Sequence, residues 1–318
     1  MADRIRKINS TTGEVRAVIT TDALAAGAEL NGMCVSADGT VFCTDMANHV
    51  VYKVFEEGRV LGAIVGKLST SGDVVSSGLY GSDGNTARLS DPYGCCVDSS
   101  NNIYVADSAN HKVKRLSSSG RCQTLAGTGS SGDVCGNNGL TVQFNAPAGI
   151  AVDKAGIVYV SDQGNDKIKK IWPSGKTVSL AGGTGGGFLD SATGYLALFD
   201  SPTGLCVDNQ GNVYVIDRNN YRVRKITVDG AVTTLCGGVA GFVDGTGNDA
   251  KFGINTWDLC MDPANNYMYM IDQTNDAVRK ISVSGTVTTF MSWNQTSGNV
   301  SSIAMDKSGF LYVLELNS

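Results

Sequence analysis

A unit of short apolar runs recurs six times along this chain, and its last copy is divided between the two ends. The sixth copy begins at Ser302 and stops at the C-terminus. Its missing half stands at the N-terminus, where Arg4-Ile-Arg-Lys-Ile8 matches Arg222-Val-Arg-Lys-Ile226. A chain whose first residues complete its last repeat is predicted to close into a ring. The five intact copies begin at Gly32, Gly94, Gly149, Gly204 and Asp258.

Each copy has the pattern of four short strands. In the third copy, runs rich in Val, Ile and Tyr cover 149–153, 157–162, 167–171 and 177–181, and Gly, Asn and Asp separate them. None of these runs is long enough for a helix. We therefore predict an all-β protein, a six-bladed β-propeller of four-stranded antiparallel blades that forms one domain over residues 1–318. The predicted blades are about 32–66, 94–127, 149–182, 204–237, 258–291, and 302–318 together with 1–19.

Composition narrows the choice of partner and compartment. The net charge of −5 implies no bulk attraction to nucleic acid, and no apolar stretch is long enough to span a membrane. Residues 1–7 show no start of a signal peptide. Four of the nine cysteines share one repeat position with alanines, which is typical of free thiols that fill small spaces near the axis. Free thiols favour a cytoplasmic or other intracellular location. The residues at that position are Cys34, Cys96, Ala151, Cys206, Cys260 and Ala304.

Two runs resemble NHL repeats: Ile103-Tyr-Val-Ala-Asp107-Ser-Ala-Asn-His-Lys-Val113 and Val213-Tyr-Val-Ile-Asp217-Arg-Asn-Asn-Tyr-Arg-Val223. The long connection 241–252 is similar to the long-repeat NHL subtype of bacterial proteins and of the teneurin propeller. The resemblance covers essentially the whole chain and implies a propeller. It does not imply one function, because NHL propellers include protein-binding, RNA-binding and catalytic members. The NHL-like lyase that cleaves peptidylglycine needs several metal-binding histidines, whereas this chain has only His49 and His111.

An Asp-x-x-Asn motif follows the second strand of every intact copy. Short acidic and amide side chains readily satisfy loop N–H groups, so we interpret the motif as a structural ring rather than a site. The sixth copy has Glu315 and Ser318 instead. The motif residues are Asp45 and Asn48, Asp107 and Asn110, Asp162 and Asn165, Asp217 and Asn220, and Asp272 and Asn275.

Two further patterns recur. Most Lys and Arg residues lie on or just before the third strand, and we interpret them as ion-pairing residues that cover apolar flanks, with a polyanion-binding surface as the alternative.

Each long connection also carries a small residue, one spacer and a large apolar residue, which predicts that the connection is pinned in a pocket. The connection before Ser302 lacks this pattern, so that sector should be shallower. The pairs are Ala28/Leu30, Ala87/Leu89, Val142/Phe144, Ala197/Phe199 and Ala250/Phe252.

The positions just before the first strands differ between copies, as a binding site requires. The aromatic rings of Tyr93 and Trp257 suit a sugar or a peptide side chain, and polar groups stand beside them. The alternative is that both rings only plug the long loops onto the core. The candidate ligand-binding residues at this axial mouth are Asn31, Tyr93, Thr203, Trp257 and Asp258, with Ala148 and Ser301 at the remaining positions.

The function that fits best is a non-enzymatic interaction or scaffold module, which presents loops on one propeller face to a protein or other ligand. The alternatives are a glycan-binding surface or virion adhesin, and an enzyme of the six-bladed lyase or lactonase type. No catalytic residue and no metal ligand stands out, and acid–base chemistry needs a positioned His, Glu or Asp pair. We expect no cofactor, with Ca²⁺ at Asp244–Asp249 as the one open alternative. Protein is the expected partner, carbohydrate a second choice, and nucleic acid and membrane are not expected.

Overall fold

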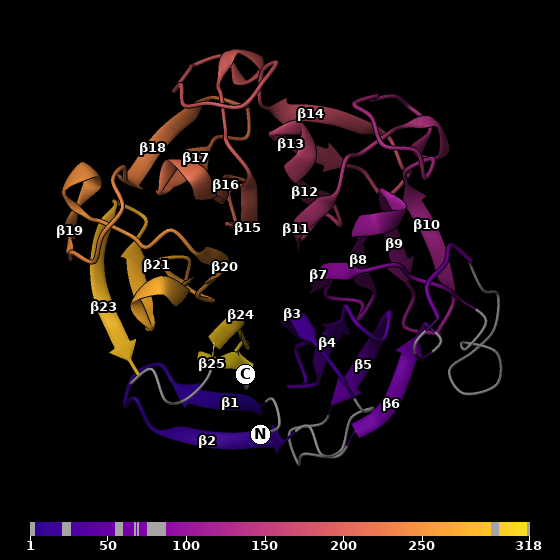
Figure 1. Ribbon diagram of the computed structural model, residues 1–318, viewed down its shortest axis with the longest axis horizontal. Coiled ribbons are helices and arrows are strands. Elements are labelled where there is room, and N and C mark those ends of the chain that lie inside the picture. Colours follow the sequence, from indigo (N-terminus) through magenta and orange to yellow (C-terminus); the bar gives the residue numbers. More distant parts are fainter. Residues whose placement is uncertain are drawn as a thin grey trace.

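The computed structural model describes residues 4–20, 27–54, 60–66, 68, 70–74, 87–293 and 299–316. Six antiparallel sheets stand around a central axis as the blades of a propeller (Figure 1). This confirms the predicted fold class. Three blades come first along the chain. Blade 1 is β3 (Leu30–Val35), β4 (Val41–Asp45), β5 (Val50–Val54) and β6 (Val60–Val65); blade 2 is β7 (Pro92–Val97), β8 (Ile103–Asp107), β9 (Lys112–Leu116) and β10 (Cys122–Ala126); blade 3 is β11 (Pro147–Val152), β12 (Val158–Asp162), β13 (Lys167–Ile171) and β14 (Thr177–Ala181).

The second half of the ring repeats this order. Blade 4 is β15 (Pro202–Val207), β16 (Val213–Asp217), β17 (Arg222–Ile226) and β18 (Val232–Gly237); blade 5 is β20 (Thr256–Met261), β21 (Tyr267–Asp272), β22 (Ala277–Ser282) and β23 (Thr286–Ser292), with the short β19 (Gly245–Thr246) on its outer edge. Blade 6 is β24 (Asn299–Met305), β25 (Phe310–Leu316), β1 (Arg4–Asn9) and β2 (Val15–Thr20).

Blade 6 is built from both ends of the chain. Its strand order is β2-β1-β25-β24, and Ile5 pairs with Leu314 while Ile8 pairs with Leu311. The predicted closure is therefore confirmed (Figure 1). Residues 1–3 and Ser318 lie outside the described part of the chain, so the loop position that was assigned to Ser318 lies there too.

The first strands crowd around the axis, and glycine permits this in four blades. A Cβ atom on Gly94 would lie 2.6 Å from the carbonyl oxygen of Ala148, and one on Gly204 would lie 2.6 Å from the Cα atom of Asp258. Blades 5 and 6 use side chains at the same position. Ser302 Oγ donates to Asp258 Oδ2 at 2.6 Å and accepts from the N–H of Met33 at 3.0 Å. Hydrogen bonds of Ser302 thus join the first strands of blades 5, 6 and 1, whereas close glycine contacts join the first strands of the other blades.

We call the segment that leads from the fourth strand of one blade to the first strand of the next blade the incoming connection of the next blade. In blades 3 to 5, such a connection crosses the outer edge of the fourth strand of the blade that it enters. Gly136 bridges to Thr177 of blade 3, Ser191 bridges to Val232 of blade 4, and β19 pairs with β23 of blade 5. These contacts cover an otherwise open sheet edge. The connections therefore lie along the outer rim, as Figure 1 shows, whereas the sequence led us to place them on one face.

The anchors predicted in these connections are buried in blades 2 to 5, where Leu89, Phe144, Phe199 and Phe252 are at most 1% exposed. Leu30 is an exception: it pairs with Asp45 as the first residue of β3, so it belongs to a strand and its assignment as an anchor was wrong. Among the described residues, no helix is long and apolar enough to cross a membrane.

Candidate functional site

A buried cation holds each incoming connection in blades 2 to 5. In blade 3, Lys169 is fully buried, and its Nζ lies 2.8 Å from Asp162 and 3.0 Å from Asp133. Asp162 ends the second strand, whereas Asp133 belongs to the connection. Because the cation touches both, it ties the connection to the blade. The other three cations are Lys114 with Asp107 and Asp73, Arg224 with Asp217 and Asp190, and Arg279 with Asp272 and Asp244.

Opposite charges counteract the effect of burial at Lys169 and Asp133, although burial still raises the pKa of Asp162. Burial alone would lower the pKa of Lys169, but Asp162 and Asp133 raise it. Burial alone would raise the pKa of Asp133, but hydrogen bonds from Lys167 and Lys169 lower it. The interpretation of the basic strand as an ion-pairing element is therefore confirmed. The second aspartate was missed, because connections of unequal length conceal its recurrence.

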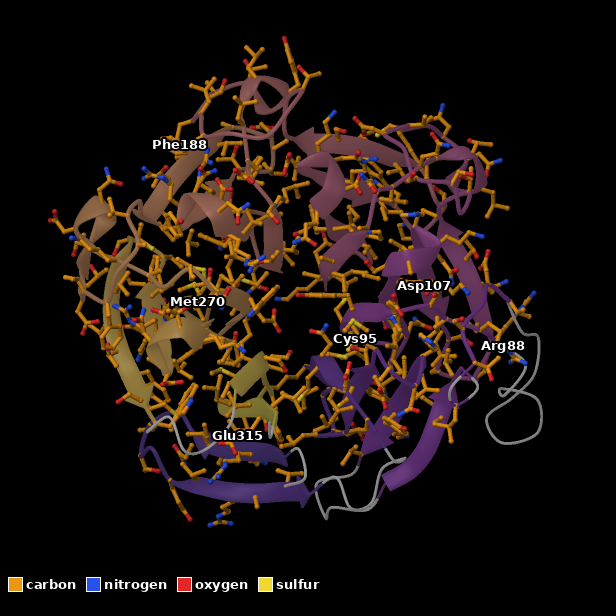
Figure 2. The ribbon with its side chains drawn as sticks, in the orientation of Figure 1. Arg88, Cys95, Asp107, Phe188, Met270 and Glu315 are labelled. Atoms are coloured by element: carbon orange, nitrogen blue, oxygen red, sulfur yellow. The ribbon has the colours of Figure 1, made fainter. Side chains whose placement is uncertain are left out.

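The Asp-x-x-Asn motif completes the same support. Asp162 accepts from the backbone N–H of Asn145 at 2.7 Å, and Asn165 donates to Asp162 at 2.7 Å and to the carbonyl of Gly132 at 2.8 Å. Equivalent contacts occur at Asp107, Asp217 and Asp272, and Asp107 lies inside its blade in Figure 2. Asp45 accepts from the N–H groups of Glu29 and Asn48 and from the Asn48 side-chain amide. In all five blades the motif thus binds loop backbone.

The two histidines cap the following blade. His49 Nδ1 accepts from the N–H of Asp91 at 3.2 Å, and His111 Nδ1 accepts from the N–H of Ala146 at 3.1 Å. Both histidines have positive φ, and so do Asp91 and Ala146. A non-glycine residue in this region is strained, so the cap stabilises a backbone conformation at the blade junction.

The first strands enclose an axial cavity of about 260 Å³. Cys34, Cys206 and Cys260 line it together with alanines at the same repeat position, as predicted. All nine cysteines are free, and burial raises the pKa of the Cys206 thiol. Figure 2 shows Cys95 near the axis as well. Burial likewise raises the pKa of Cys34 and Cys260, so these three thiols at the axis are protonated packing groups.

Aromatic rings stand at one mouth of this cavity. The ring centroids of Tyr93 and Trp257 are 6.5 Å apart, and the planes are inclined at 47°. The guanidinium of Arg218 lies 4.1 Å from the Trp257 ring centroid, and the indole N–H donates to Gln273 Oε1 at 2.9 Å. Burial, reinforced by Asp258, raises the pKa of Tyr93, so its phenol is neutral. The side chains of Tyr93 and Trp257, from the opposite blades 2 and 5, thus meet above the axis. The contact of Arg218 with Trp257 was not predicted from the sequence.

Of the other candidate residues, two line the cavity and one is hydrogen-bonded to the backbone away from it. Asn31 and Asp258 line the cavity, but Thr203 is fully buried, and its hydroxyl donates to the carbonyl of Thr256 at 3.3 Å. Burial raises the pKa of Asp258 to about 6, although hydrogen bonds from Ser302, Ile303 and Leu259 oppose that shift. Ser301 lines the cavity at 9% exposure, and its Oγ has no hydrogen-bond partner among the described residues.

The acidic connection of blade 5 was the candidate calcium site. Asp244 accepts from Arg279 at 2.7 Å and from the N–H and hydroxyl of Thr289, both at 2.9 Å. Its carboxylate is therefore engaged by a guanidinium. Among the described residues, no three His, Cys, Asp or Glu side chains are placed to hold a metal ion.

The incoming connection of blade 4 exposes four large apolar side chains, and that of blade 5 exposes Val239, Phe242, Val243 and Ile254. Within the incoming connection of blade 4 (residues 182–201), Tyr195 is 70% exposed and Leu196 is 53% exposed, and Phe188 and Leu189 are also exposed. We call these four residues the rim patch. Figure 2 shows Phe188 on the outer rim. No sequence motif marks the patch, because each residue is unremarkable by itself.

Together, the blades, the buried ion pairs and the terminal closure define a six-bladed β-propeller assembled from repeats. Residues 89–116 and 199–226 match the NHL repeat family model, so the chain carries NHL repeats. NHL repeat-containing protein 2 from Bos taurus is 32% identical over 162 residues, which are 49% of this chain and 22% of that protein. Protein SUPPRESSOR OF QUENCHING 1, chloroplastic, from Arabidopsis thaliana is 31% identical over 173 residues, 50% of this chain and 16% of that protein. The match thus spans less than a quarter of the length of these relatives.

Solved structures agree on the fold. A streptogramin B lyase structure aligns with a TM-score of 0.60 and 14% identity, over 99% of this chain and 87% of that chain. A chain of a nidogen/laminin complex aligns with a TM-score of 0.60 and 15% identity, over 91% of this chain and 93% of that chain. At such identities the likeness establishes the architecture and leaves function to the residues.

Proposed function

We propose that this protein is a non-enzymatic interaction module that binds a protein partner through the rim patch. The observation that carries the proposal is the exposure of Phe188, Leu189, Tyr195 and Leu196 on one connection. Aromatic and large aliphatic side chains supply most of the energy at protein interfaces. NHL propellers commonly mediate such contacts, which supports the same choice.

The connection that carries the patch is held rigidly. Arg224 donates to the carbonyl of Leu189 at 2.9 Å and to the carbonyl of Leu198 at 3.0 Å, while it pairs with Asp190. Phe199 is fully buried. A surface that is already ordered loses little conformational entropy on binding, so these supports favour affinity.

Affinity capture from native extract tests the proposal with the double variant Tyr195→Ser/Leu196→Ser. Leu140→Ser is the matched control, because Leu140 is similarly exposed at the equivalent place in the connection of blade 3. A captured protein is then purified and titrated against each form. We expect affinity at least tenfold weaker for the double variant and within twofold of wild type for the control. Equal affinity for the wild type and the double variant would refute the proposal.

A second candidate function is binding of a small polar ligand, such as a sugar, at the axial mouth. It is favoured by the Oγ of Ser301, which has no hydrogen-bond partner among the described residues and lines the same cavity as the rings of Tyr93 and Trp257. An aromatic face and a few polar groups are what a sugar site needs. A glycan-array signal that Trp257→Ala abolishes and Trp257→Phe retains would support this function, and a signal unchanged in Trp257→Ala would exclude it.

A further inference from the structure

The sequence of the sixth sector lacks the connection anchor that blades 2 to 5 have. In blades 2 to 5, a buried Leu or Phe from the incoming connection fills a pocket between neighbouring blades. The incoming connection of blade 6 is short, and its residues 294–298 are Asn-Gln-Thr-Ser-Gly. It lacks the small-x-large apolar pattern of the other connections, and its one large apolar residue, Trp293, lines the cavity described below.

The strand register shows which residues should surround such an anchor in blade 6. Phe144 packs with Val160 and Ile171 of blade 3, and Lys169 Nζ lies 4.9 Å from its ring centroid. In blade 3, Val160 pairs with Lys169. In blade 6, Val313 pairs with Arg6, and Ile8 takes the place of Ile171.

A cavity of about 180 Å³ lies at this place. A cavity of about 150 Å³ with an apolar lining is large enough to take up benzene. The Trp293 indole nitrogen is buried without a hydrogen-bond partner among the described residues. The lining residues are Arg6, Ile8, Val15, Met291, Trp293, Val300, Val313 and Glu315.

Arg6 is also less completely paired than its counterparts. Its Nε lies 2.7 Å from Glu315, which occupies the position of Asp162, and its side chain is 32% exposed. Lys169 has a second carboxylate, Asp133, supplied by the connection. Among the described residues, Arg6 has no carboxylate partner besides Glu315. Glu315 is labelled in Figure 2 near the C-terminal end.

No connection among the described residues covers the outer edge of blade 6. The N–H of Thr177 donates to the carbonyl of Gly136 at 2.8 Å, and that of Val232 donates to Ser191 at 2.8 Å. Val15 holds the same register in β2, since it pairs with Ile8 as Thr177 pairs with Ile171. No connection bridges to Val15 within the described part of the chain. An open edge beside an apolar pocket is suited to strand addition.

We infer that blade 6 binds an extended segment of a partner polypeptide, which takes the place that a long connection fills in blades 2 to 5. An aromatic or leucine side chain of the segment fills the cavity, a carboxylate nearer its N-terminus pairs with Arg6, and its backbone bridges to Val15. The internal connections show the order of the carboxylate, the bridging residue and the anchor. These are Asp190, Ser191 and Phe199 in blade 4, and Asp244, Gly245 and Phe252 in blade 5. This site is distinct from the rim patch and does not depend on it.

The connection of blade 5 provides a probe. A fluorescent peptide with the sequence of residues 241–253, Gly-Phe-Val-Asp-Gly-Thr-Gly-Asn-Asp-Ala-Lys-Phe-Gly, is titrated into the full-length protein and followed by anisotropy. We expect saturable binding. Peptides with Phe252→Ala or Asp244→Asn should bind at least tenfold more weakly, because one loses the group for the cavity and the other loses the charge for Arg6.

Two protein variants complete the test. Val313→Phe fills the cavity and Arg6→Gln removes the positive charge, so each variant should weaken peptide binding at least tenfold. If Val313→Phe is unstable, Arg6→Gln still tests the site, because it hardly changes the volume of the lining side chains. Tyr195→Ser/Leu196→Ser should leave peptide binding within twofold of wild type, which separates this site from the proposed rim patch. Absence of saturable peptide binding, or equal binding to wild type and Arg6→Gln, would overturn the inference.

Discussion

Single residues decide whether a connection is held, and the buried cation is the clearest case. The third residue of the third strand is Lys114, Lys169, Arg224 or Arg279 in blades 2 to 5, and all four are essentially inaccessible to solvent. Blade 1 has Tyr52 at this position in the register. A buried charge is stable only when it is paired and hydrogen-bonded, and two carboxylates with a backbone carbonyl meet that condition.

Removal of one cation should therefore leave a buried carboxylate without a counter-charge. We expect Lys169→Met to lower the free energy of unfolding by about 3–5 kcal/mol, because Asp162 is fully buried. The control Lys170→Met changes a neighbour that lies over the Tyr159 and Trp172 rings, and it should cost about 1 kcal/mol or less. Urea unfolding measures both values, and equal small losses would contradict the structural role of Lys169.

Asp258 should make stability depend on pH. Its pKa is about 6 in the folded protein because of burial, above the usual value for aspartate. The folded state therefore binds the proton more tightly, and the contribution of this group is fully present below about pH 4 and is lost as the pH rises through 6. We expect Asp258→Asn to flatten the melting temperature between pH 4 and 6.5. An unchanged pH profile in the variant would show that Asp258 does not titrate there.

At the scale of elements, the strands were predictable and the paths of the connections were not. Alternating Val, Ile and Tyr runs between turn residues specify strand length and side-chain direction locally. The path of a connection depends on contacts such as Asp133 with Lys169 and Gly136 with Thr177, which join residues far apart in sequence. The buried anchors at Phe144 and Phe199 could be predicted because they recur at a fixed spacing.

The anchor should control the connection that carries the rim patch. Phe199→Ala removes a fully buried ring, so we expect a loss of about 3–5 kcal/mol in the free energy of unfolding and faster amide exchange at 187–198. Partner binding through Tyr195 should weaken in parallel. Exchange rates by mass spectrometry test this, with Leu140→Ala as an exposed control. Unchanged exchange across that connection would show that Phe199 does not hold it.

For the whole molecule, closure was predictable and the site was predictable only in part. The match between the N-terminal Arg4–Ile8 and an internal third strand is a direct sequence signal, and the sheet order bears it out. Tyr93 and Trp257 were recognised because they break the repeat. Ser301 was placed at the mouth from its repeat position, but Arg218 was missed, since only the curvature of the ring brings its guanidinium over Trp257.

Loss of the closing strand should destabilise the entire ring. Deletion of residues 1–8 removes most of β1, so β25 loses its partner and β2 is detached. We expect a fall of at least 10 °C in the melting temperature, because burial of Ile5 and Ile8 and a full ladder of hydrogen bonds are lost together. Differential scanning calorimetry measures this, and a melting temperature equal to that of the intact chain would refute closure by the N-terminus.

The central claim is that pinned connections cover blades 2 to 5, whereas no connection among the described residues covers the outer edge of blade 6. Amide exchange of three equivalent residues, resolved by NMR, tests it most directly. Thr177 and Val232 donate to connections, so their amides should exchange slowly, whereas the Val15 amide should exchange at least a hundredfold faster. Protection of Val15 equal to that of Thr177 would contradict the account.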